Sequence, residues 1–181
     1  ILVLFPFLFN LLASYQKQRI LTFINPSSDP LSSSYNIVQS LISIGSGGLI
    51  GKGFGEATQS ILKFLPERHT DFIFASISEN LGFLGGLLLL GLYFYLLHRV
   101  YKIKDYVNDE FSGLVLMGLY FLLLVHIFLN IGMNIGIVPI VGVTLPFASY
   151  GGSSLLTNFI ILGIISSIKF DYSKSRSFEI R

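Results

Sequence analysis

Long apolar stretches separated by short polar connections dominate the second half of the chain, and they cover residues 72–97, 111–138 and 150–168. Each is long enough to cross a hydrocarbon core of about 30 Å as a helix, which takes about 20 residues. Residues 1–13 are also apolar but too short to span, so we interpret them as the end of a longer helix. The pattern predicts an all-α integral membrane protein, a polytopic helical bundle of about four spans with the first one truncated.

Residues 14–71, before the first complete span, mix polar and apolar positions. Ile37, Leu41 and Ile44 recur at helical spacing, which predicts a short amphipathic helix over residues 35–44. A connection this long is usually functional or disordered, and its many aliphatic side chains argue against disorder. We therefore expect a large folded loop outside the bilayer.

Lysine and arginine are distributed unevenly among the other connections. The segments 98–110 and 169–181 carry several each, whereas 139–149 carries none. Because short cytoplasmic loops are enriched in basic residues, the first two segments are predicted to be cytoplasmic and the third to lie outside. The segment 14–71 then also lies outside; it contains basic residues, but the rule weakens for loops of about 60 residues.

Composition narrows the classes of protein. Hydrophobic residues make up 52% of the chain and charged residues 12%, with a mean hydropathy of +0.71. An ordinary soluble domain carries about 25% charged residues, so the low charge argues against one. The 17 phenylalanines and the many aliphatic residues exclude a disordered chain. The absence of cysteine excludes a disulfide scaffold, and a net charge of +2 gives no reason to expect a nucleic-acid partner.

Ionisable groups are most concentrated directly before the first complete span, where Glu67, Arg68, His69 and Asp71 stand within five positions. Asp71 occupies a place suited to a helix N-cap. It is equally placed, at the outer membrane boundary, to accept a proton or to hold a divalent cation. Arg68 and the nearby Lys63 have the chemistry to bind phosphates.

Polar side chains also occur inside the predicted spans. An ionisable group such as Glu79 is costly there, so it is either functional or a paired structural carboxylate. His126, Asn130 and Asn134 recur every four residues and form one polar stripe. The stripe either hydrogen-bonds between helices or forms the wall of a substrate cavity.

Two glycine-rich segments remain open to more than one interpretation. Residues 45–53 fail the Walker pattern at two positions, so no nucleotide is expected. The segment is either a tightly packed turn or a backbone nest that holds a lipid-linked pyrophosphate beside Lys52. Residues 149–154, with Ser153, open the last span and suit either helix packing or a helix N-terminus that binds an anion.

Several stretches occur in the order in which one family has them, including the specific runs LPERHTDFIF and SYGGSS. They lie at residues 15–20, 29–30, 35–40, 44–48, 51–53, 64–74 and 149–154. They resemble the C-terminal half of a SEDS protein, a member of the RodA/FtsW/SpoVE group. Arg68, where FtsW-like proteins tend to have alanine, makes the chain most similar to RodA.

The resemblance implies a peptidoglycan glycosyltransferase that polymerises lipid II on the outer face of the bacterial cytoplasmic membrane, in cell-wall elongation, cell-shape maintenance and cell division. It implies a class B penicillin-binding protein as transpeptidase partner, together with other elongation-machinery membrane proteins. The essential aspartate of the family falls on Asp71. Glu79 matches a family position, whereas Asn80 departs from the pattern. The N-terminal half of the family is absent, so activity is expected of the complete protein.

The resemblance and the residues together predict an inverting transfer with undecaprenyl pyrophosphate as leaving group. Asp71 would act as general base, or would hold a divalent cation, Mg or Mn, against the pyrophosphate. The residues expected to bind pyrophosphate or glycan are Lys52, Lys63, Glu67, Arg68, His69, Glu79 and Ser153. Lys17 and Arg19 are weaker candidates for phosphate.

Two alternatives belong to other classes of protein. A lipid II flippase would use Glu79 and the polar stripe from His126 to Asn134 for transport. A membrane scaffold would dock a partner through the small-residue pairs Gly82/Gly86 and Gly132/Gly136.

Overall fold

The computed structural model describes residues 13–24, 33–57, 64–65, 67–107 and 109–179, and all regular structure among them is helical. The elements are α2 (Ser14–Ile24), α3 (Ser33–Ser46), α5 (Ile73–Ile103), the 3₁₀ turn η2 (Lys104–Tyr106), α6 (Glu110–Asn134) and α7 (Gly152–Glu179). The predicted span end at 1–13 and Lys63 lie outside the described residues, apart from Ala13. The predicted all-α fold class is confirmed.

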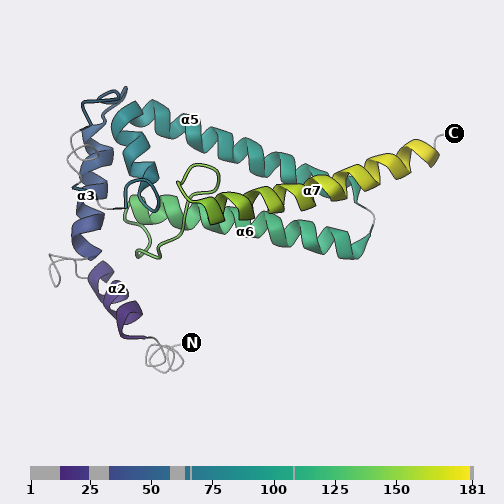
Figure 1. The fold of residues 1–181 in the computed structure, drawn as a ribbon, viewed down its shortest axis with the longest axis horizontal. Coiled ribbons are helices and arrows are strands. Elements are labelled where there is room, and N and C mark those ends of the chain that lie inside the picture. Colours follow the sequence, from purple (N-terminus) through teal and green to yellow (C-terminus); the bar gives the residue numbers. More distant parts are fainter. Residues whose placement is uncertain (1–12, 25–32, 58–63, 66, 108, 180–181) are drawn as a thin grey trace.

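Three helices are long and apolar enough to cross a membrane, and these stretches are Ile73–Tyr106, Glu110–Asn134 and Gly152–Asp171. They lie side by side, while α3 runs across one end of the bundle and α2 extends from it (Figure 1). Large apolar side chains such as Leu88 and Phe94 face outward, as expected where hydrocarbon replaces water. Of the long loop, α3 therefore packs on the bundle end from which α5 begins.

Buried side chains form clusters along the bundle. Near the loops the cluster contains Leu65, Phe72, Ala75, Met133 and Ile140. The middle cluster contains Phe74, Tyr93, Ile127, Ile131 and Leu145. At the far end Val100, Leu116, Leu123, Ile161 and Ile165 join α5, α6 and α7. Because lipid is as apolar as leucine, close van der Waals packing in these clusters holds the helices together.

Helix α5 is broken at Gly82, whose φ of 68° and ψ of −165° are not helical. The break releases backbone groups on both sides from their helical partners, and the chain before α5 satisfies them. The N–H of Phe83 donates to the carbonyl of Gly48 at 2.8 Å, and the next N–H donates to that of Leu49 at 3.1 Å. The first turns of α5 consequently run beside α3, and the remainder runs along α6 (Figure 1).

The glycine-rich segment 45–53 is a tightly packed turn against this break. The N–H of Lys52 donates to the carbonyl of Glu79, and that of Gly53 to the carbonyl of Asn80, both at 3.0 Å. A side chain on Gly51 would meet the Asn80 carbonyl directly. The structure favours the tightly packed turn over the pyrophosphate nest, because the N–H groups of Lys52 and Gly53 already pair with α5.

The observed helices depart from the predicted spans at their ends. Helix α6 ends at Asn134 rather than at 138, because Gly136 takes a positive φ of 73° and the chain folds back. The N–H of Ile137 donates to the carbonyl of Gly132 at 2.8 Å and so closes this turn. Helix α7 continues past 168 into the predicted tail, and α3 covers the helix predicted over 35–44.

Candidate functional site

The segment 67–72 forms a turn that places Asp71 at the start of α5. The N–H groups of Thr70 and Phe72 donate to the carbonyl of Glu67 at 3.3 and 3.0 Å. Phe72 is buried, 2% exposed, whereas Asp71 is only partly buried. The N-cap interpretation of Asp71 is wrong, because the N-cap residue of α5 is Phe72 and no side chain of its own caps the helix.

Two asparagines of α6 fix the backbone at this turn. Asn130 Nδ2 donates to the carbonyl of Asp71 at 2.9 Å and to that of Val143 at 2.7 Å. Asn134 Nδ2 also donates to the carbonyl of Asp71, at 3.0 Å. Asn134 Oδ1 accepts from the N–H of Ala75 at 3.1 Å, so a residue of α6 caps the first turn of α5. Both asparagine side chains are fully buried.

The same asparagine reaches α3, because Ser40 Oγ donates to the carbonyl of Asn134 at 2.8 Å. Asn130 and Asn134 of the polar stripe therefore join α3, α5 and α6 at one point, which we call the hub. His126, one to two turns earlier on α6, is partly exposed and does not take part in this hub. Hydrogen bonding, rather than a cavity wall, explains Asn130 and Asn134.

The loop between α6 and α7 holds the turn from the other side. Ser149 Oγ donates to the carbonyl of Thr70 at 2.6 Å and accepts from the N–H of Leu145 at 2.8 Å. The N–H of Tyr150 donates to the carbonyl of His69 at 2.7 Å. Main-chain contacts thus fix residues 69–71 firmly. No hydrogen bond to the Asp71 carboxylate is found within the described residues, so its oxygens remain available to a ligand.

Arg19 of α2 lies beside Asp71, across the backbone at Gly142. The guanidinium Nη1 donates to the carbonyls of Ile140 and Val141 at 3.3 and 3.2 Å. A methyl group on Gly142 would stand 3.4 Å from Asp71 Oδ2 and 4.0 Å from Arg19 Nη1. The glycine, with a φ of 75°, therefore lets the loop approach both charged groups.

The surroundings of Asp71 raise the pKa of its carboxyl group above the ordinary value. Burial is the largest cause, because it disfavours the charged form, and the negative charge of Glu67 acts in the same direction. The positive charge of Arg19 opposes both. A carboxylate with a raised pKa is a stronger base than an ordinary aspartate, which is the direction that proton abstraction requires.

The other charged residues of the turn lie at its exposed surface. Glu67 Oε2 accepts from Thr70 Oγ1 at 2.9 Å, and Arg68 Nε donates to His69 Nε2 at 3.0 Å. An open cavity of about 450 Å³ lies between His69 and the start of α7. Ser153 is exposed in the first turn of α7.

Glu79 lies in a separate place, at the break of α5. It is fully buried, and its Oε1 is 3.7 Å from Nζ of Lys52, which the glycine turn carries. Because Gly82 breaks the helix one turn later, Glu79 belongs to the segment beside α3 rather than to a straight span. The structure favours the paired structural carboxylate over an isolated intramembrane charge.

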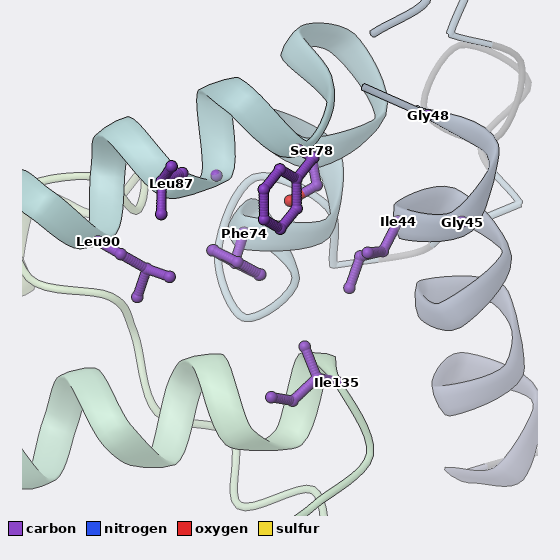
Figure 2. Close-up of a pocket in the computed structure, with 10 residues that line it drawn as sticks. Ile44, Gly45, Gly48, Phe74, Ser78, Leu87, Leu90 and Ile135 are labelled. Carbon is purple, nitrogen blue, oxygen red and sulfur yellow. The ribbon is translucent and has the colours of Figure 1, made fainter. Parts of the chain in front are cut away.

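A second cavity, of about 270 Å³, opens between the end of α3, the break in α5 and the end of α6 (Figure 2). Ile44, Leu87, Leu90 and Ile135 surround it, and its lining is almost wholly apolar. Such a cavity suits hydrocarbon rather than a charged group.

The metal-ligating side chains around Asp71 fit a divalent cation only in part. Within the described ranges, no three His, Asp or Glu side chains converge as a metal site would require. Asp71 and Glu67 are close enough for their charges to interact. One or two carboxylates are what Mg²⁺ takes from a protein when phosphates of a substrate supply further oxygens. These residues therefore fit a cation shared with a substrate, not a cation held by the protein alone.

The sequence did not indicate that Arg19 lies beside Asp71, and it identified no partner for Asn130 and Asn134. Arg19 lies 52 positions before Asp71, so no local spacing joins them. The four-residue repeat of the asparagines did signal a shared face, but the carbonyl that they bind has no signature in sequence.

Comparisons with known proteins agree with this architecture. A family model described as "Cell cycle protein", FTSW_RODA_SPOVE, matches residues 1–174. Peptidoglycan glycosyltransferase MrdB of Escherichia coli (strain K12) is 49% identical over 160 residues, which cover 88% of this chain and 43% of that protein. Peptidoglycan glycosyltransferase RodA of Treponema pallidum (strain Nichols) is 43% identical, covering 88% and 37%. Stage V sporulation protein E of Bacillus subtilis (strain 168) is 42% identical, covering 86% and 42%.

A solved structure shares the fold. It is described as "Structural coordination of polymerization and crosslinking by a peptidoglycan synthase complex", and it matches with a TM-score of 0.72 at 32% identity, over 89% of this chain and 43% of that one. The chain spans less than half the length of the relatives it matches. The family model nevertheless covers nearly all of it, and the chain belongs to the FtsW/RodA/SpoVE family.

Proposed function

We propose that the protein to which this chain belongs is a peptidoglycan glycosyltransferase that polymerises lipid II. The observation that carries the proposal is the carboxylate of Asp71, whose backbone is fixed by two buried asparagines while its oxygens stay available. Its raised pKa and the adjacent Arg19 suit a base that works beside a phosphate. Relatives that bear the name peptidoglycan glycosyltransferase support the same reaction.

In the proposed reaction, a hydroxyl oxygen of one disaccharide attacks the anomeric carbon of the other substrate. The new glycosidic bond forms as the bond from that carbon to the pyrophosphate breaks, and undecaprenyl pyrophosphate leaves with the electron pair. The configuration at the carbon inverts. Asp71 accepts the proton of the attacking hydroxyl, a role worth about 10²- to 10⁴-fold in rate.

The groups around Asp71 supply positive charge for the leaving group. Arg19 lies beside Asp71, and Arg68 belongs to the turn itself. Guanidinium groups bind phosphate oxygens in pairs. In the alternative role of Asp71, its carboxylate would share a divalent cation, Mg²⁺ or Mn²⁺, with the phosphates, and the cation would neutralise their negative charge. The apolar cavity beside α3 provides a surface for the hydrocarbon of a lipid-linked substrate.

We also propose the setting of this reaction. The basic segments at the far end of the bundle favour the cytoplasmic side there, which puts Asp71 outside the bacterial cytoplasmic membrane. RodA-named relatives favour a role in cell-wall elongation and cell shape. The likeness to a chain of a peptidoglycan synthase complex supports a class B penicillin-binding protein as partner, with other elongation-machinery proteins beside it.

The test is polymerisation of labelled lipid II by the full-length protein with its transpeptidase partner, whose own active site is blocked. Asp71→Asn removes the base but keeps the shape, and we expect a rate loss of about 10²- to 10⁴-fold. Asp105→Asn removes an exposed aspartate at the other end of the bundle and serves as the matched control. Full activity of the Asp71→Asn protein would overturn the proposal.

The lipid II flippase alternative is less well supported. Asn130 and Asn134 already bind backbone, and Glu79 is paired with Lys52, so the polar groups that transport would use have structural roles. A vesicle assay separates the two: movement of lipid II between leaflets without any glycan product would favour the flippase.

A further inference from the structure

A basic pocket lies at the end of the bundle opposite Asp71, between the last turns of α5 and the middle of α7. Its volume is about 290 Å³. Arg99 and Lys102 border it from α5, and Lys169 borders it from α7. The hydroxyl groups of Tyr106 and Ser166 also border it. The pocket has no part in the chemistry proposed for Asp71.

The charges in this basic pocket are of one sign. No acidic residue lines it, and no ion pair is found for Arg99, Lys102 or Lys169 within the part of the chain that the structure describes. Asp105, Asp109, Glu110 and Asp171 occur at the same end of the bundle but do not line the pocket. Asp109 instead accepts from the N–H of Ser112 at 2.8 Å. An anion entering the pocket would therefore meet uncompensated positive charge.

Below the charges the walls are apolar. Leu96 lies two turns before Lys102 on α5, and Leu162 lies two turns before Lys169 on α7. At 1.5 Å per residue, each leucine is about 10 Å deeper along its helix than its lysine. The buried side chains of Val100 and Ile165 form the floor between them.

We propose that this pocket binds an anionic phospholipid, with its phosphate held by Arg99, Lys102 and Lys169 and an acyl chain along the apolar walls. The vertical order of charge above hydrocarbon matches the order within a lipid, whereas a free phosphate would gain nothing from the apolar walls. Basic pockets between membrane helices are known to bind acidic headgroups. The basic last turn of α5 is also favoured by the helix dipole, so the test must separate a site from general charge.

The test is native mass spectrometry of the full-length protein in mixed micelles with phosphatidylglycerol or phosphatidylcholine. Lys102→Gln removes a pocket charge, and Lys104→Gln removes the same charge two residues away, outside the pocket. We expect retained phosphatidylglycerol to fall about fivefold in Lys102→Gln and to stay unchanged in Lys104→Gln. Lys102→Arg, which keeps the charge, should bind as the unmodified protein does. Arg99→Gln, which removes another pocket charge, stands in if Lys102→Gln fails to fold.

Three outcomes would overturn the proposal. Equal losses in Lys102→Gln and Lys104→Gln would show general charge attraction without a site. Retention of phosphatidylcholine to the same extent as phosphatidylglycerol would show that the pocket does not select for the negative charge of the headgroup. Displacement of the lipid by excess inorganic phosphate, in proportion to its concentration, would show an anion site that does not use the acyl chain.

Discussion

Replacing Asn134 with leucine tests whether the hub on α6 holds the candidate catalytic turn. The side chain is fully buried and accepts from the N–H of Ala75, which lies in the first turn of α5 and has no helical partner. Leucine of similar size leaves that N–H unpaired, whereas the carbonyl of Asp71 keeps its bond from Asn130. One orphaned buried group costs about 1–3 kcal/mol.

The assay is thermal unfolding in detergent, followed by lipid II polymerisation on the same samples. A loss of about 1–3 kcal/mol corresponds to a fall in Tm of about 2–12 °C for a protein of this size. Activity should fall further than folding alone explains, because the Asp71 carbonyl loses one of its two side-chain donors. The control is Asn158→Leu, which changes a buried asparagine of α7 that has no hydrogen bond within the described residues.

Because no bond is lost there, Asn158→Leu should leave Tm nearly unchanged. The reasoning is refuted if Asn134→Leu unfolds at the same temperature as the unmodified protein, or if both leucine variants lose the same amount.

Three further predictions concern charge, backbone space and capping. Arg19→Gln removes the charge that lowers the pKa of Asp71, so the acid limb of the pH–rate profile should move to higher pH; an unmoved limb would separate Arg19 from Asp71. Gly51→Ala should prevent the turn from packing on α5 and reduce the yield of folded protein, whereas Gly45→Ala, which meets open space, should not. Asp109 caps α6, and the hydrogen bonds that it accepts from Ser112 lower the pKa of its carboxyl group in the folded state. The cap should therefore stabilise the fold fully above the unfolded-state pKa of Asp109. This stabilisation should be lost as the pH falls through the lower folded-state pKa. Asp109→Ala should lower Tm at neutral pH and abolish that pH dependence.

Hydropathy was sufficient to find the three spans, because lipid imposes a long apolar run on any helix that crosses it. It did not find the break at Gly82. Glycine is tolerated within helices, so Gly82 alone does not predict a break. The carbonyls that pair with the N–H groups after the break belong to Gly48 and Leu49, far earlier in the chain. The helix predicted as one continuous span is therefore broken at Gly82, and Glu79 is paired with Lys52.

In the candidate site too, local sequence signals were predictable and long-range contacts were not. Asp71 was found because four ionisable groups stand together in sequence, a local signal. The N-cap interpretation, one of two left open for Asp71, rested on position alone, and a side chain of α6 does the capping instead. Arg19 and Gly142 reach Asp71 only through the tertiary fold, so no pattern along the chain could rank them.

The break in α5 also bears on how the protein is made. Non-helical backbone at membrane depth is tolerated only where other protein groups satisfy it. Here those groups belong to the segment 48–53, which leaves the ribosome before α5 does. The partner for the bend is thus already present when the bend forms, and neither a later helix nor a second protein has to supply it.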